Sequence, residues 1–259
     1  MCIALIAHQV HQTYPLIVAA NRDEYHARPT AAAAWWPDDI LAGRDLAAGG
    51  TWFGIRHTGR IALLTNYRDG LARDATARSR GELVVNALLG QRPAQRTLGD
   101  LLGSGADYQG FNLVAGYPGQ LYCASNRSWM VQRIPEGVFG LSNHLFDSPW
   151  PKVERAKERL REVLRGPVIP PEDLFDVLND RTQAADDELP ETGIGIEHER
   201  FLSPPFIVGE SYGTRSSTVL LVDRLGGATF IERTFAPDGH ATGDLRFSFP
   251  LLAPATHHP

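Results

Sequence analysis

The amino-acid sequence predicts an α+β fold in which two antiparallel sheets pack together and a pair of helices covers each outer face, a four-layer αββα sandwich. Strand patterns and helical patterns occur in separate runs, without the strict alternation that a parallel sheet requires. Short polar or glycine-containing turns join consecutive strand segments, as in antiparallel hairpins. Layering of this kind would bury the apolar face of every segment described below.

Four strands are expected first. Residues 2–10 and 15–20 are apolar stretches rich in Ile, Val and Leu, and the short polar segment between them is typical of a hairpin. Residues 51–69, TWFGIRHTGRIALLTNYRD, repeat this form with a turn at His57, Thr58 and Gly59. The amino-terminal part of the chain therefore supplies two hairpins.

A helical pair and four more strands follow. The apolar spacing becomes helical over residues 80–90 and 93–102, and Gly103 is a plausible end of the second helix. Residues 111–126 form a hairpin pattern around Pro118 and Gly119, and residues 128–143 continue with two short strands. Strands thus return after the first helices.

The second helical pair covers residues 150–166 and 170–180. In the first of these, one face is apolar, the opposite face is charged, and Gly166 ends the helix; the apolar face consists of Val153, Ala156, Leu160, Val163 and Leu164. Residues 215–235 give a last hairpin across Gly226 and Gly227. Between the second helical pair and this hairpin, residues 184–213 show little apolar periodicity, which is typical of a lid or binding loop.

Composition limits the classes of protein and partner. The chain has 259 residues, 43% of them hydrophobic and 21% charged, as in compact globular proteins, and we expect residues 1–259 to form one domain. A net charge of −5 disfavours nucleic acid as a partner. No segment has the layout of a secretory signal or the length of a membrane span, and the two cysteines fit a reducing compartment, so a cytoplasmic location is expected.

The beginning of the chain carries the first candidate for chemistry. If the first hairpin turns near Gln12 to Tyr14, antiparallel pairing brings Cys2 next to the cluster Arg22, Asp23 and Glu24. Removal of Met1 would leave residue 2 with a thiol and a free α-amine, whose ordinary pKa of about 7.7 to 8.0 suits it to take the thiol proton. Arg22 would favour the thiolate, and Asp23 or Glu24 would hold the ammonium form. The alternative is a small apolar residue at a strand start beside a solvated charge cluster.

Asparagines that follow apolar strands form a second group of candidates. Asn66, Asn126 and Asn143 each come after Ser or Thr at a strand end, where a side-chain amide is able to donate to an oxyanion. The alternative is that Asn stands there because it suits turns. Arg215, just before the last apolar hairpin, is a candidate for binding a substrate carboxylate or phosphate, or else an ordinary ion-pair residue.

Six segments together resemble the NRDE family, also called the transport and Golgi organization protein 2 family: MCIALIA, AANRDEYHARPT, GGTWFG, LLTNYRD, LSN and TGIGIEHERFLSPPFIVGESYGTRSSTVLLVD. This family is similar to the N-terminal nucleophile hydrolases, whose αββα fold agrees with the order of elements above. The resemblance implies catalytic roles for Cys2, Asn66, Asn143 and Arg215. Such hydrolases keep two residues between the Arg and the Asp that follow the cysteine, whereas Arg22 and Asp23 are adjacent. An ungapped match therefore gives the roles of that Arg and that Asp to Asn21 and Glu24.

Two functions follow from the residues and the resemblance. In the first, Cys2 attacks a non-peptide linear amide or thioester, with Asn66 and Asn143 stabilising the oxyanion. The candidate substrate-binding residues lie in the same motifs: Asn21, Trp52, Tyr67, Arg68 and Tyr212. In the second, the same cleft carries a small-molecule or lipid-like ligand, haem or an acyl-CoA, without catalysis. Neither requires a bound cofactor, and the sequence has no metal-binding motif such as HExxH.

Overall fold

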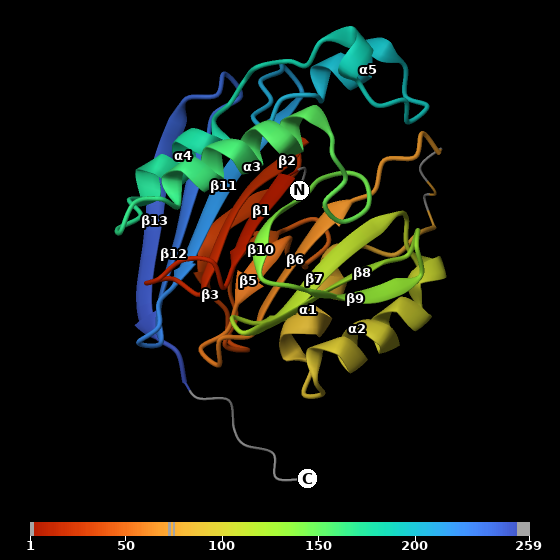
Figure 1. The fold of residues 1–259 in the computed structure, drawn as a ribbon. Helices are drawn as coiled ribbons and strands as arrows, with labels where there is room; N and C mark the ends of the chain where they lie inside the picture. The colour runs from red at the N-terminus through yellow and green to blue at the C-terminus, as the bar shows by residue number, and fades with distance from the viewer. Residues whose placement is uncertain (1–2, 72–73, 75, 253–259) are drawn as a thin grey trace.

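Two antiparallel sheets stand face to face in the computed structural model, which describes residues 3–71, 74 and 76–252. The helices α1 and α2 cover the outer face of one sheet, and α3 and α4 cover the outer face of the other (Figure 1). The predicted αββα layering is confirmed.

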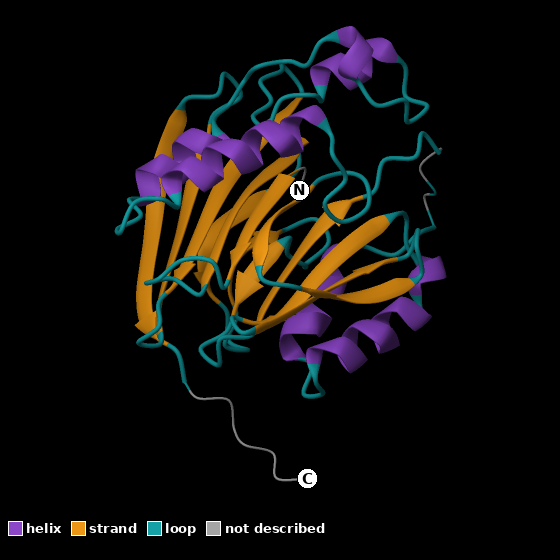
Figure 2. Cartoon of the chain, in the orientation of Figure 1, coloured by secondary structure: helices purple, strands orange, loops and turns teal. Residues whose placement is uncertain are grey.

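Sheet A has the strand order β10-β1-β2-β11-β12-β13 and sheet B runs β3 to β9 in sequence. The strands of sheet A are β1 (Ile3–His8), β2 (Leu16–Tyr25), β10 (Gly137–Leu141), β11 (Tyr212–Val222), β12 (Gly227–Phe235) and β13 (Ala241–Pro250). The strands of sheet B are β3 (Thr30–Trp35), β4 (Leu41–Asp45), β5 (Phe53–Ile55), β6 (Ile61–Asn66), β7 (Phe111–Tyr117), β8 (Gln120–Ser125) and β9 (Met130–Ile134). Figure 2 shows both sheets in orange between the helices.

The four expected helices are α1 (Gly81–Leu89), α2 (Ala94–Gly103), α3 (Pro151–Val163) and α4 (Pro171–Leu178). Each buries an apolar face against its sheet. Leu83, Val84 and Leu88 of α1 pack on sheet B, while Ala156 and Leu160 of α3 pack on sheet A. Within the described ranges, no helix combines the length and the apolar character that crossing a membrane would take.

Alternation along the strands builds the core between the sheets. Ala4 and Ile6 of β1 belong to this inner core, whereas Ile3, Leu5 and Ala7 face α3 and α4. The two sheets meet in aromatic contacts such as Phe53 on Phe230, whose ring centroids are 5.6 Å apart. The central strands of each sheet are therefore buried on both faces.

Several elements differ from the sequence prediction. Three strands were not predicted: β3 consists of TAAAAW, with few residues that favour strands, β4 is only five residues long, and β13 is mostly exposed and polar. The segment 184–213 was expected to lack elements but contains α5 (Ile196–Phe201) and the short 3₁₀ helix η2 (Asp186–Glu188). The second strand, predicted to end at Ala20, continues through the polar cluster to Tyr25. This last difference decides where the candidate site residues point.

Candidate active site between the two sheets

The start of β1 lies between two polar strand ends. Ile3 pairs with Asn21 on β2, and Ala4 pairs with Leu141 on β10, two residues before Asn143. Cys2 itself lies outside the described residues. The sequence predicts that the start of the chain lies next to the cluster at residues 21–24. Among the described residues, Ile3 lies next to this cluster.

Asn21 and Asp23 lie on the face of sheet A that the helices cover. The Asn21 amide donates to the carbonyl oxygens of Leu178 and Pro205 at 2.9 Å, and its oxygen accepts from the Ser217 hydroxyl. Asp23 accepts a hydrogen bond from Thr214 at 2.6 Å. Both side chains therefore tie β2 to the segments that lead into and out of residues 180–211.

Arg22 points the other way, into the space between the sheets. Its guanidinium is 4% exposed and lies over the Trp52 ring, 4.2 Å from the ring centroid. Nη1 of Arg22 has no hydrogen-bond partner in the part of the chain that the structure describes. Burial lowers the pKa of this guanidinium, and the nearby Glu24 carboxylate opposes that effect.

Two further polar side chains share this inner face, and the motifs did not reveal them. Ser216 is the strand partner of Arg22, and Glu232 on β12 is the strand partner of Thr218. Glu232 accepts a hydrogen bond from the backbone N–H of Ala33 on the opposite sheet. Ser216 Oγ and Glu232 Oε2 are buried without a partner among the described residues. A glutamate at an inward position of a buried strand, as in ATFIERTF, is the signal that sequence reasoning overlooked.

A second part of the site forms where the ends of β6 and β10 meet. The Asn143 amide donates to the carbonyl oxygen of Asn66 at 3.0 Å, and the Arg68 backbone N–H donates to the carbonyl oxygen of Asn143 at 2.7 Å. The Arg68 guanidinium also donates to Asn143 Oδ1 at 3.3 Å. The structure thus brings together Asn66, Arg68 and Asn143 at one corner of the two sheets.

Strand alternation places the side chain of Asn66 on the face that α1 and α2 cover, because its strand partner Phe111 packs there. Thr65 and Asn112 face the other sheet instead, and Asn112 donates to Thr65 Oγ1 at 3.1 Å and to the carbonyl oxygen of His144 at 2.7 Å. Asn112 is fully buried within a strand that is otherwise mostly apolar. It joins the polar inner surface near Asn143.

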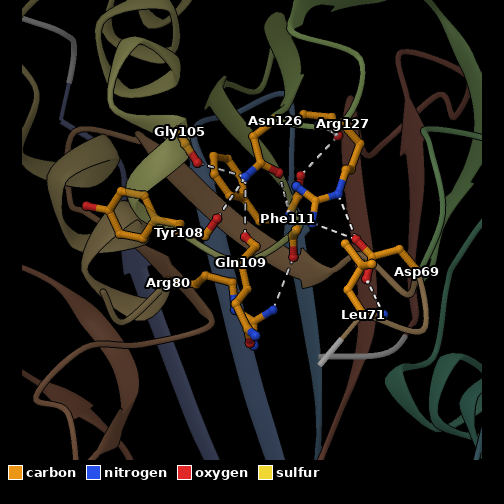
Figure 3. Close-up of polar contacts among 11 residues, drawn as sticks. Asp69, Leu71, Arg80, Gly105, Tyr108, Gln109, Phe111, Asn126 and Arg127 are labelled. Carbon is orange, nitrogen blue, oxygen red and sulfur yellow. Dashed lines mark hydrogen bonds and ion pairs between the residues drawn. The ribbon is translucent and has the colours of Figure 1, made fainter. Parts of the chain in front are cut away.

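Figure 3 shows that the remaining strand-end asparagine, Asn126, has a structural role. Its oxygen accepts from the Phe111 N–H at 2.8 Å, and its amide donates to three backbone carbonyls, those of Gly105, Tyr108 and Gln109. The neighbouring Arg127 forms a two-pronged ion pair with Asp69. This ion pair fixes the loop that carries Tyr67 and Arg68, and Tyr67 rests against His144 with 5.1 Å between ring centroids.

Glu24, Arg215 and Tyr212 lie at the rim. Arg215 occupies an irregularity in the pairing of β11 with β2 and donates to the carbonyl oxygens of Tyr25 and Arg28. Glu24 is 3.8 Å from the Arg28 guanidinium, and the Tyr212 ring packs edge-on against that of Tyr25. These three residues organise the turn after β2.

A cover made of residues 189–203 lies beside this corner, and we call it the lid. Glu199 on α5 accepts from Arg68 at 2.6 Å, and the exposed fractions of these two side chains are 3% and 10%. Glu199 also accepts from the backbone N–H and the hydroxyl of Thr192. The cavity between the lid and Trp150 measures about 10 Å³, enough for about one water molecule. Figure 1 shows α5 above the end of the sandwich where the loop after β6 emerges.

No group of three or more His, Cys, Asp or Glu side chains is placed to hold a metal ion within the described ranges. The second cysteine, Cys123, is buried in the core between the sheets, and burial raises its pKa to about 12. Cys123 is therefore an unreactive thiol at neutral pH.

Solved structures share this architecture at low sequence identity. A variant of the conjugated bile acid hydrolase from Clostridium perfringens aligns with 97% of this chain and 92% of its own at a TM-score of 0.51 and 7% identity. An ortholog of N-acylethanolamine-hydrolyzing acid amidase from Caenorhabditis elegans covers 85% of this chain and 92% of its own, with a TM-score of 0.50 and 13% identity. The chain has the N-terminal nucleophile hydrolase fold.

Sequence comparison gives the family. The family model described as Transport and Golgi organisation 2 matches residues 1–237. The Transport and Golgi organization 2 homologs of Bos taurus and Mus musculus are 36% and 34% identical to this chain over 244 residues, which is 85% of this chain and 87% of each relative. The chain therefore belongs to the Transport and Golgi organisation 2 family.

Proposed function

We propose that this protein is a hydrolase that uses Cys2 as an amino-terminal nucleophile against a non-peptide linear amide or thioester. The observation that carries the proposal is the pairing of Ile3 with Asn21, beside the buried guanidinium of Arg22, whose Nη1 has no hydrogen-bond partner among the described residues. Cys2 directly precedes Ile3 in the sequence. The fold shared with an acid amidase and a conjugated bile acid hydrolase agrees with the proposal.

The chemistry would follow from a thiolate at residue 2. The α-amine takes the thiol proton, and the sulfur attacks the carbonyl carbon of the substrate, so that the carbonyl oxygen becomes an oxyanion. Collapse of this intermediate expels the amine or thiol, which receives the proton from the α-ammonium. Water then cleaves the acyl-enzyme thioester and gives a carboxylic acid and the free enzyme thiol.

The described residues support distinct roles around this step. Arg22 stabilises the thiolate by its positive charge. The Asn143 amide donates to the oxyanion, and Asn66 and Arg68 hold that amide in place. Asn21 and Asp23 act as positioning residues, because their hydrogen bonds fix the end of β2. Glu24 lies nearest the rim on the same strand face as Arg22 and would accept a hydrogen bond from the α-ammonium.

The Trp52 ring packs against the Arg22 guanidinium and fixes its position. Tyr67 and Tyr212 would contact the substrate chain at the rim, where both rings are partly exposed. Arg215 supports the rim through its bonds to the backbone of the turn after β2. The substrate is thus expected to enter between the loop after β6 and the turn after β2.

The first experiment is the intact mass of the purified protein before and after iodoacetamide treatment at neutral pH, with peptide mapping of the label. Loss of Met1 and labelling of Cys2 but not Cys123 are expected. Hydrolysis of an acyl-CoA and of an N-acylethanolamine is then compared between wild type, Cys2→Ala and the control Cys123→Ala.

We expect Cys2→Ala to abolish hydrolysis and Cys123→Ala to retain it. Hydrolysis that survives Cys2→Ala unchanged would overturn the proposal, and so would full activity of protein that retains Met1. Absence of turnover combined with saturable binding of haem or an acyl-CoA would assign the protein to carriers instead.

A further inference from the structure

Glu232 is the one carboxyl group, among the described residues, that is buried between the sheets on the same inner face as Arg22. Its side chain is 1% exposed. Oε1 accepts the Ala33 N–H, while Oε2 is buried without a partner in the described part of the chain. A buried polar atom without a partner is costly, so the position invites a functional explanation.

Arg22 and Glu232 lie two strands apart on the same face of sheet A. Arg22 on β2 pairs with Ser216 on β11, and Thr218, two residues further along β11, pairs with Glu232 on β12. With β11 between them, the Cα atoms of Arg22 and Glu232 are about 12 Å apart, given the usual strand spacing and rise per residue. Both side chains are long, and the charge of Arg22 acts on the Glu232 carboxylate.

Trp52 and Gly43 cover both groups from the opposite sheet. The Trp52 ring lies against the Arg22 guanidinium. A Cβ atom built on Gly43 would lie 2.4 Å from the Trp52 ring and 3.0 Å from Glu232 Oε2. Glu232, Trp52 and Arg22 therefore form one buried cluster, in which the charges are poorly screened by water.

We propose that Glu232 is a positioning residue for the Cys2 thiol and acts through the charge of Arg22. This inference rests on the proposed nucleophilic role of Cys2. When Glu232 is protonated, the charge of Arg22 stabilises the thiolate at residue 2. When Glu232 is ionised, its charge offsets that of Arg22 and the thiolate is stabilised less.

Burial supports this exchange, because it raises the pKa of Glu232 to about 7, an effect that Arg22 and the Ala33 hydrogen bond oppose. The other charged groups that act on Arg22 are Glu24 and Arg28 near the end of β2, Asp45 on β4 and Arg215 on β11. Glu24, Arg28 and Arg215 are partly exposed, so solvent screens them more than it screens Glu232. Asp45 is buried, and its carboxylate forms an ion pair with Arg28.

The test is the rate of iodoacetamide labelling of Cys2 from pH 5 to pH 10 in wild type and Glu232→Gln. Glutamine keeps an oxygen for the Ala33 N–H and removes the charge. We expect the apparent pKa of the Cys2 thiol to fall by about 0.3 to 1 in Glu232→Gln. This corresponds to as much as tenfold more thiolate at a pH at which Glu232 of the wild type is ionised and most of the thiol is still protonated, and to no difference at pH 5. A second neutral variant, Glu232→Met, should give the same shift without the Ala33 hydrogen bond.

Two controls separate an electrostatic role from a merely structural one. Glu172→Gln removes an exposed carboxylate that pairs with Arg233, the sequence neighbour of Glu232 on the other face of β12, and should leave the profile unchanged. In an Arg22→Gln background, Glu232→Gln should have no further effect. Unchanged profiles in both Glu232 variants would overturn this inference while leaving the nucleophile intact, whereas failure of wild-type Cys2 to label would overturn the proposed function itself.

Discussion

Because Gly43 has no side chain, it leaves room for the Trp52 ring that packs against Arg22. An alanine there would place its Cβ 2.4 Å from the Trp52 ring, closer than atoms approach, so the ring must move. We expect Gly43→Ala to lower the free energy of unfolding by about 1 to 3 kcal/mol, as overpacking in a core does. Urea denaturation followed by tryptophan fluorescence measures this change.

The matched control is Gly99→Ala in α2. No atom comes within 4 Å of a Cβ built there, and the position lies in the interior of an exposed helical face. Alanine should therefore stabilise the protein by about 0.5 to 1 kcal/mol. Equal effects at the two glycines would contradict the packing argument.

Glu232 also makes stability depend on pH. Its pKa rises from the ordinary value of 4.5 to about 7 on folding, so between these values the folded state binds more protons than the unfolded state. The contribution of Glu232 to stability is therefore fully present below pH 4.5, and it is lost as pH rises toward 7. At about 1.4 kcal/mol for each pKa unit, the loss amounts to roughly 3 kcal/mol.

We expect Glu232→Gln to remove this dependence, so that the variant gains stability relative to wild type at pH 8 but not at pH 4.5. Chemical denaturation at both pH values checks the prediction. A difference between variant and wild type that is the same at both values would mean that Glu232 does not change its charge in this range.

At the scale of elements, the sequence was most informative where apolar periodicity was strong. The four helices begin and end within three residues of their predicted bounds, because each has one continuous apolar face. The strands β3 and β13 were not predicted, since alanine-rich and exposed polar sequences acquire strand structure only by pairing with a neighbour.

The sequence indicated several residues that meet at the candidate site, but it did not indicate the directions of their side chains. Residues 21–24 were expected to act as a cluster beyond the strand, yet β2 continues through them, and alternation sends Asn21 and Asp23 to one face and Arg22 to the other. Glu232 and Asn112 come from strands whose pairing is set by tertiary structure. A short sequence motif does not predict which distant strands become neighbours in the fold.

The lid depends on one buried ion pair. Removing the charge of Glu199 leaves the Arg68 guanidinium, which is 10% exposed, without its carboxylate partner. Breaking such a pair costs about 3 kcal/mol, so the amides of residues 192–203 in Glu199→Gln should exchange with solvent deuterium about 100-fold faster. Hydrogen exchange measured by mass spectrometry reports this directly.

Glu197 on the same helix provides the control. Its carboxylate pairs with Arg200 but is 81% exposed, and exposed pairs contribute less than about 1 kcal/mol. Glu197→Gln should therefore leave the exchange of the lid nearly unchanged. Similar acceleration in both variants would indicate that the lid responds to the charge of α5 in general and not to its contact with Arg68.

At the scale of the whole molecule, the shared core should make the two sheets unfold together. Phe230 on sheet A contacts Phe53 on sheet B, and both are almost completely buried in the core that the sheets share. Phe230→Ala should lower the free energy of unfolding by about 3 to 5 kcal/mol. If residues 1–259 are one cooperative unit, the slowest amides of both sheets exchange only when the whole protein unfolds. Phe230→Ala should then lower the free energy of exchange by the same amount for β6 and β7 on sheet B as for β1 and β2 on sheet A.

The alternative is that each sheet and its helices form a separate folding unit. Acceleration confined to β1, β2, β11 and β12 would then be observed, and fluorescence and circular dichroism would report different unfolding midpoints for this variant. The outcome bears on function, because the candidate site takes Arg22 and Glu232 from one sheet and Trp52 from the other. Only a cooperative sandwich keeps these three side chains in contact whenever the protein is folded, and coincident midpoints are therefore the expected result.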